Sequence, residues 1–179
     1  MKWTLDVSHS AAEFSVKHLM ISTVRGRFKT FTGTGETGAD GALKSVEMEL
    51  DTASIDTNEA KRDAHLRSAD FFDAEKFPKI IFRSSHIEQK GDSVTLNGSL
   101  TMHGVTKPVT LKGEFSTPVT DPWGNSRAAL EVSTKINRKE WGLVWNMALE
   151  AGGLMVAEDV KISVEAEAVA VKEEAAAAA

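Results

Sequence analysis

The feature that most constrains the fold of this chain is the alternation of apolar and polar residues along several long segments. Between Val160 and Ala168 every second residue is apolar, and the residues between them are Lys, Ser or Glu. Successive side chains of a strand point to opposite faces, so a period of two predicts strands with one buried face. We predict eight strands on this basis, around residues 14–20, 24–31, 46–50, 80–86, 94–102, 109–115, 130–136 and 160–168.

Turn-forming sequences separate several of these segments, at residues 39–41, 90–92 and 121–124. Short connections of this kind favour antiparallel neighbours. Antiparallel strands with one apolar face need that face covered, and a sheet that closes on itself covers it and removes its own edges. The pattern therefore predicts an all-β fold, an extended eight-stranded antiparallel β-barrel, formed as one domain by residues 1–171.

One segment, residues 58–77, breaks the alternation. Asn58 is of a residue type that caps helices, and a narrow apolar stripe follows it, formed by Ala60, Ala64 and Leu66. The pair Phe71-Phe72 is expected in a second short turn. We predict one helical insertion here. The residues 172–179, KEEAAAAA, offer nothing to pack and are expected to form a disordered tail.

The composition of the 179 residues excludes several classes of function. Hydrophobic residues make up 41% and charged residues 26%, which is typical of a globular protein. The net charge is -5 and the basic residues do not cluster, so the chain lacks the basic face that nucleic acid or anionic lipid would require. The chain has no cysteine, which excludes disulfides and thiolate chemistry.

Targeting signals and membrane-spanning segments are not recognisable in the sequence. No run approaches the ~18 apolar residues of a transmembrane helix, so we expect no stable membrane insertion. The first ten residues, MKWTLDVSHS, lack the apolar core of a secretory signal. We therefore expect a cytoplasmic protein, or a periplasmic one if a leader has been removed.

The main candidates for catalytic or metal-binding chemistry are the five histidines, His9, His18, His65, His86 and His103. They form no HExxH motif and no carboxylate-rich loop, and the sequence Ser8-His9-Ser10 lacks the glycines of a nucleophile elbow. We predict no catalytic residues, no metal site and no cofactor. The histidines are expected to bind backbone groups or to contact a ligand.

Three residues are placed where they could meet the polar end of a ligand. His18 shares a face with Phe14 and Val16 and should point inward, although a core histidine satisfied by the protein fits the same pattern. His103 lies at the corner between two strands, next to a glycine that lets the chain turn. Trp141 is expected near a barrel end, where it either plugs the barrel or offers its indole N–H at a pocket mouth.

The interior of an eight-stranded barrel is either filled by side chains or holds one small ligand. Gly98 and Gly113, with small Ala and Ser residues, fall on the predicted inward faces, where they fill space poorly. This favours a cavity, although glycines in barrel strands also serve coiling and bends. Tyrosine is absent, so such a cavity would be apolar with few polar anchors.

Several motifs, taken in order, resemble one known family, the YceI-like or polyisoprenoid-binding proteins. The resemblance runs from about Trp3 to Val169. The motifs are highly specific together, and they are DVSHSAAEFSVKHL at 6–19, VRGRFKTFTG at 24–33, RDAHLRSADFFDAEKFPKIIFRS at 62–84, GSLTMHGVTKPVTL at 98–111 and INRKEWGL at 136–143. The chain has Glu140-Trp141-Gly142 where the family more often has Asp-Phe-Gly, which keeps an acid, an aromatic residue and a glycine.

The resemblance implies a lipocalin-like barrel with a helix beside it and a long apolar channel for an isoprenoid chain, as in an isoprenoid quinone or a polyprenyl derivative. Family members are often dimeric, which makes a homodimer an alternative to the monomer. By strand parity, the channel walls are predicted to be Phe14, Val16, Phe28, Met48, Leu50, Phe82, Leu100, Met102, Leu130 and Val132. The predicted headgroup contacts are His18, His103 and Trp141.

These observations lead to one main hypothesis and two alternatives. The main hypothesis is non-catalytic binding, carriage or storage of a long-chain isoprenoid lipid in an apolar barrel tunnel. The first alternative is a structural or interaction barrel with a filled core. The second is an enzyme acting on a lipid-like substrate with His18 or His103 as acid or base, although no second positioned group accompanies either histidine.

Overall fold

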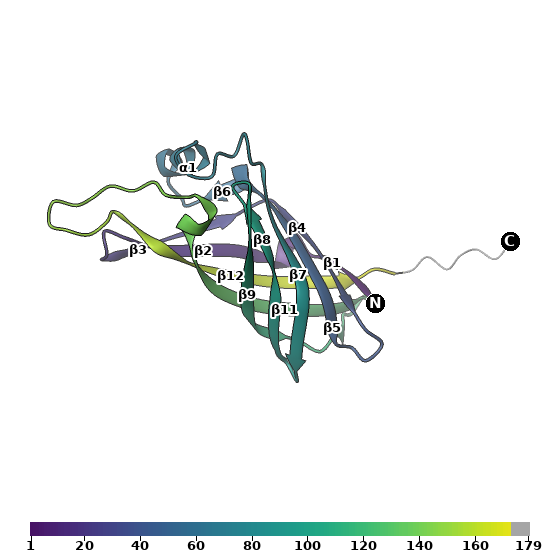
Figure 1. Cartoon of the computed structure of the whole chain (residues 1–179). Coiled ribbons are helices and arrows are strands. Elements are labelled where there is room, and N and C mark those ends of the chain that lie inside the picture. The colour runs from purple at the N-terminus through teal and green to yellow at the C-terminus, as the bar shows by residue number, and fades with distance from the viewer. Residues whose placement is uncertain (173–179) are drawn as a thin grey trace.

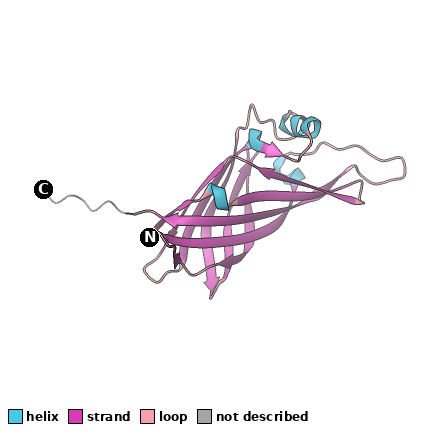
Figure 2. Ribbon diagram, turned by 180° about the vertical axis from the view of Figure 1, so that it is seen from behind, coloured by secondary structure: helices cyan, strands magenta, loops and turns pink. Residues whose placement is uncertain are grey.

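The structure, a computed structural model, describes residues 1–172 and consists mostly of β-strands (Figure 1 and Figure 2). Within these residues the strands are β1 (Lys2–Leu5), β2 (Ala11–His18), β3 (Ser22–Phe28), β4 (Phe31–Thr37), β5 (Leu43–Asp51), β6 (Ile55–Asp56), β7 (Lys79–Lys90), β8 (Ser93–Met102), β9 (Val105–Phe115), β10 (Val119–Thr120), β11 (Ser126–Asn137) and β12 (Val156–Ala170). The helices of the same residues are α1 (Ala60–Arg67) and the 3-10 helices η1 (Val7–His9), η2 (Thr52–Ser54) and η3 (Arg138–Trp141). The predicted tail, apart from Lys172, lies outside the described residues.

The antiparallel sheet closes on itself. The barrel has eight strand positions. Three of them are each formed by two consecutive shorter strands, β1 and β2, β3 and β4, and β5 and β6, and the other five are formed by β7, β8, β9, β11 and β12. β12 closes the ring, because it pairs with β11 along one side and with β1 and β2 along the other. The short β10 adds to the start of β11. The eight-stranded antiparallel barrel predicted from the alternation is confirmed.

Three of the eight positions are bent rather than continuous. Residues 24–31, predicted as one strand, divide at Lys29-Thr30. β3 pairs with β2 and β6 before the division, whereas β4 pairs with β1 and β5 after it. Matching interruptions occur at η1, between β1 and β2, and at η2, between β5 and β6. The alternation therefore identified these positions but not the points at which they change direction.

The helix α1 begins one residue later than predicted and is capped differently. Glu59 is its N-cap, and the Glu59 carboxylate accepts hydrogen bonds from the backbone N–H groups of Lys61 and Arg62. Asn58, the predicted cap, instead has a φ of 61°, in the left-handed region that asparagine tolerates in turns. The carboxylate of the next residue can reach two orphan donors, which makes Asn58 unnecessary as a cap.

The buried face of α1 also differs from the predicted apolar stripe. Ala60 and Ala64 are exposed, while Asp63 is buried. The Asp63 carboxylate accepts hydrogen bonds from the backbone N–H of Thr57 at 2.8 Å and from its hydroxyl at 2.6 Å. A polar contact therefore fixes this short helix to the chain that enters it. The predicted second turn after the helix is confirmed, and it buries Phe71.

One seam of the barrel is held by side chains. β5 pairs with β7 only from Glu47 onward. In the first half of β5, the N–H of Leu43 donates to Oε1 of Gln89 and the N–H of Val46 donates to Oγ of Ser84, each at 2.9 Å. The register of β7 against β8 shifts between Ser84 and His86. This bulge moves β7 away from the ladder that it would otherwise form with β5.

The two ends of the barrel differ. α1 and η3 lie at one end, called here the α1 end, and the hairpin of β2 and β3 projects beyond it together with the loop that leads into β12 (Figure 1). The N-terminus and the end of β12 lie at the opposite end, where the N–H of Val171 donates to the carbonyl of Lys2. The loop between β9 and β11 also belongs to the opposite end, because β9 runs away from η3.

Candidate functional site: an apolar cavity inside the barrel

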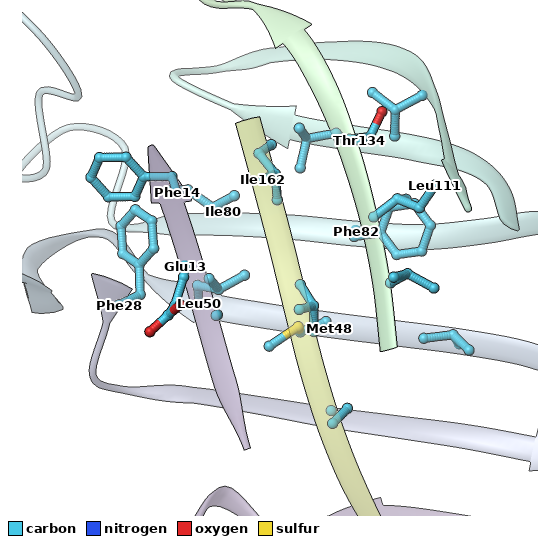
Figure 3. A pocket seen from close by; sticks show the side chains of 18 of the residues that line it. Glu13, Phe14, Phe28, Met48, Leu50, Ile80, Phe82, Leu111, Thr134 and Ile162 are labelled. Carbon is cyan, nitrogen blue, oxygen red and sulfur yellow. The ribbon is translucent and has the colours of Figure 1, made fainter. Parts of the chain in front are cut away.

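The inward faces of the strands enclose a cavity of about 230 Å³. Its wall runs from Trp3 and Phe115, near the opposite end, to Phe72 and Leu143 at the α1 end. The side chains that point into it are almost all hydrocarbon, as the close view illustrates (Figure 3). The interior of this barrel is therefore hollow and can take up an apolar molecule.

All ten residues predicted as channel walls line this cavity. They come from six different strands, and the period of two that marked them in the sequence is the reason that they converge. They are Phe14, Val16, Phe28, Met48, Leu50, Phe82, Leu100, Met102, Leu130 and Val132. Their contact with a ligand stays a prediction.

The glycines that leave room in the cavity are not those predicted. Gly33 and Gly35 of β4 line it, and a Cβ added to Gly35 would meet only the carbonyl oxygen of Ser45, at 3.3 Å. A Cβ on Gly98 would overlap the carbonyl oxygen of Arg83, and one on Gly113 would overlap that of Glu131. Gly98 and Gly113 therefore allow close strand approach, the other role of glycine in barrel strands.

Some wall residues were missed in the sequence for an identifiable reason. Trp3 and Leu5 belong to β1, which is too short for a period of two to be recognised. Leu43 begins β5 ahead of the alternation at residues 46–50. In contrast, Leu96, Leu111 and Phe115 follow the alternation that predicted β8 and β9, so the same parity argument would have found them.

The three predicted headgroup contacts lie outside the cavity wall. His18 is the last residue of β2, half-buried, and pairs with Ser22 and Val156. The Nδ1 atom of His103 lies 3.0 Å from the carbonyl oxygen of Trp141, and the His103 ring packs edge-on against Phe77 at 4.9 Å. These contacts give His103 a structural role in the β8–β9 turn.

Trp141 lies buried at the α1 end of the barrel, outside the cavity wall. Its side chain is 1% exposed, and its indole Nε1 donates to the carbonyl oxygen of Leu100 at 3.0 Å. Since an indole has one donor, this hydrogen bond occupies its polar group. The indole N–H therefore already has a partner within the protein, and a headgroup contact by Trp141 stays a prediction.

Arg138 is a functional candidate that sequence reasoning missed. It lies at the α1 end, is 4% exposed and contributes to the cavity wall. Its guanidinium donates to the carbonyl oxygens of Leu143, Ala157 and Val156. Desolvation lowers the pKa of Arg138, and the charge of Glu158 opposes this shift. Arg138 thus holds both ends of the loop between η3 and β12 against the barrel.

A cluster of charged groups lies away from the cavity. Within residues 1–172, Asp6, His9 and Glu167 form one group whose ligand atoms could surround a metal ion. The Nη1 atom of Arg127 contacts the carboxylates of both Asp6 and Glu167, and its Nε donates to Asp121 at 2.9 Å. This guanidinium compensates the carboxylates, so the cluster is explained as a salt-bridge network.

No helix within residues 1–172 combines the length and the hydropathy that crossing a membrane requires.

Comparison with known proteins points to one family. Residues 3–168 match the YceI-like domain family. Protein YceI of Escherichia coli O17:K52:H18 is 39% identical to this chain over 158 residues, which cover 88% of this chain and 81% of that protein.

Solved structures support the fold. BcnA of Burkholderia cenocepacia superposes with a TM-score of 0.79 at 22% identity, covering 91% of this chain and 98% of that one. A polyisoprenoid binding domain from Saccharophagus degradans, implicated in plant cell wall breakdown, gives a TM-score of 0.66 at 16% identity, covering 94% and 98%. The family match spans almost the whole barrel and confirms the resemblance inferred from the motifs. The chain belongs to the YceI-like family.

Proposed function

We propose that this protein binds and carries, or stores, a long-chain isoprenoid lipid inside the barrel, without chemical change to that lipid. The observation that carries the proposal is the hollow interior with its almost wholly apolar wall. A filled core would leave no such space. Among the similar structures, one is named as a polyisoprenoid binding domain, which favours an isoprenoid over other long-chain ligands.

The energetics of an apolar tunnel favour a chain-like ligand. A chain that buries about 400 Å² of apolar surface gains roughly 10 kcal/mol at about 25 cal/mol per Å². Loss of translational and rotational freedom removes a large part of this gain. Met48 and Met102 in the wall suit a branched chain, because the methionine side chain adapts to irregular shapes.

The arrangement of polar groups favours binding without catalysis. A general acid or base must come within hydrogen-bond reach of the reacting atoms. Neither His18 nor His103 lines the cavity, and His103 already contacts the Trp141 carbonyl. Arg138, which does line it, has its guanidinium bound to three backbone carbonyls.

The proposal is tested by native mass spectrometry of the purified protein, followed by mass spectrometry of its organic extract. The protein is also unloaded and then offered an isoprenoid quinone, a polyprenol and a straight-chain fatty acid of matched length. We expect one isoprenoid per chain and preference over the fatty acid. The proposal is overturned if the unloaded protein takes up none of these molecules, or takes up only the fatty acid. Recovery of a chemically altered isoprenoid would instead support an enzyme.

A further inference from the structure

Two apolar projections extend side by side beyond the α1 end of the barrel. They are the tip of the β2–β3 hairpin, residues 19–22, and the loop of residues 142–155 (Figure 1). The N–H of Leu19 donates to the carbonyl oxygen of Met155 at 2.8 Å, and the N–H of Met155 donates to that of Met147 at 2.9 Å. The first of these hydrogen bonds joins the two segments, and the second lies within the loop; we call the two segments together the apolar tip.

The apolar tip exposes large hydrophobic side chains to solvent. Ile21 is 83% exposed and Met20 is 63% exposed, and Val144 and Met147 are more than half exposed. Charged residues make up 26% of the chain, whereas the 18 residues of the tip contain one, Glu150. Large exposed apolar side chains that occur together at one end of a protein mark an interaction site more often than single scattered ones.

The backbone of the hairpin turn adds a second observation. Leu19 and Met20 have φ values of 52° and 61°, in the left-handed region that bulky residues rarely adopt. A turn with two left-handed central residues strongly favours Asn-Gly. The chain thus places a methionine where glycine would fit the backbone better, and strain of this kind concentrates at functional segments.

The tip is continuous with the cavity. Leu143 of the loop and Val156, which follows the loop, line the cavity, and so does Val16 of the hairpin. Val156 is paired directly with His18, at the base of the tip. An apolar ligand that enters or leaves at this end of the barrel therefore passes beside the exposed side chains of the tip.

We propose that the apolar tip docks reversibly on the surface of a lipid bilayer, with Met20 and Ile21 inserted among the acyl chains, so that the α1 end of the cavity faces the membrane. The tip contains no Lys or Arg, and the chain carries a net charge of -5. These charges favour a neutral bilayer, bound by apolar insertion, over an anionic one. The inference rests on the proposed function, because the bilayer would be the surface from which the carried lipid comes.

The test measures binding of the full chain to phosphatidylcholine vesicles by flotation, with no isoprenoid present. The variant Met20→Gly/Ile21→Ser removes the two exposed side chains and gives the turn a glycine at a left-handed position, so its fold is not expected to weaken. The matched control is Val119→Ser, which removes an exposed side chain at the opposite end. We expect the tip variant to lose at least about tenfold in partitioning and the control to stay within about twofold of the parent.

Further outcomes distinguish the docking from the proposed function. Uptake of isoprenoid is measured separately, from detergent solution without vesicles. Vesicle binding without isoprenoid uptake would support docking and remove the proposed function. Isoprenoid uptake without vesicle binding would overturn docking alone. A third outcome is that the parent protein does not bind vesicles but forms an oligomer, and that light scattering shows the tip variant to be monomeric. The tip would then be a contact between copies of this chain, and docking would be overturned.

Discussion

The indole Nε1 of Trp141 donates a hydrogen bond of 3.0 Å to the carbonyl oxygen of Leu100, linking η3 to the end of β8 across the barrel mouth. Trp141→Phe keeps an aromatic ring but leaves this buried carbonyl without its donor. We expect the free energy of unfolding to fall by about 1–3 kcal/mol in urea titration. Isoprenoid uptake should be unchanged, because Trp141 does not line the cavity. Lost uptake at full stability would instead make Trp141 a ligand contact.

Gly35 and Gly113 should respond differently to the same small substitution. Gly113→Ala places a methyl group against the backbone of β11 at Glu131, and such overpacking should destabilise the barrel by about 1–3 kcal/mol or more. Gly35→Ala meets only one atom, the Ser45 carbonyl oxygen, and it also restricts the unfolded chain. Its unfolding free energy should stay within about 1 kcal/mol of the parent. Urea titrations of the two variants compare them directly, and equal losses would contradict the inference that Gly35 has more room for a methyl group than Gly113.

Met102→Trp tests whether the cavity is the binding site. Met102 lines the cavity and is 6% exposed, so a larger ring there should fill empty space and block uptake of an isoprenoid quinone. In a filled core the same change would cost about 1–3 kcal/mol through overpacking. Lys112→Trp, on the outer face of β9, is the control and should bind normally. Normal uptake by Met102→Trp, measured by native mass spectrometry, would place the ligand elsewhere.

The ion pairs of Arg127 should make the free energy of unfolding depend on pH in the acid range. Its guanidinium is the main reason that the pKa of Asp121 lies well below its ordinary value. The pKa of Asp6 is also lowered, first by the Ser8 hydroxyl, then by His9 and Arg127. Carboxyl groups with depressed pKa values stabilise the fold above their ordinary pKa of about 4 and lose this contribution as the pH falls through the lower folded-state value.

Arg127→Met should therefore lower the free energy of unfolding most at neutral pH, where the carboxylates of Asp6, Asp121 and Glu167 would repel one another. The difference from the parent should shrink as the pH falls below about 4. Urea titrations at pH 7, 5 and 3 measure this difference. Lys135→Met, which breaks an exposed pair with Asp159, serves as the control and should have little effect at any of the three values. A loss for Arg127→Met that is independent of pH would indicate packing rather than charge.

Alternation predicted the barrel and most of its wall because both depend on the same period of two. The parity that placed Phe14 and Met48 on one face of their strands also directs them into the cavity. The polar residues were harder to place. His18 continues the parity of β2, but the strand ends there and the cavity does not reach it. For polar residues such as His18, the position along the strand decides contact with the cavity as much as the face of the strand does. Periodicity gives the face but not the position.

Contacts between distant segments were also beyond the reach of the sequence pattern. Asp63 is buried because Thr57, on the chain entering α1, supplies two donors, and no helical period predicts this. Arg138 is buried because carbonyls around the start of β12 gather about its guanidinium. Which glycine opens the cavity and which permits close strand approach depends on the opposing backbone. These features are set by tertiary structure.

The seam between β5 and β7 bears on how this barrel avoids association with other strands. A closed sheet has no edges, yet the first half of β5 carries backbone groups without a ladder partner in β7. Ser84 and Gln89 bind the N–H groups of Val46 and Leu43 there. The barrel thus contains a short internal edge, and these two side chains occupy the donors with which another strand could otherwise pair.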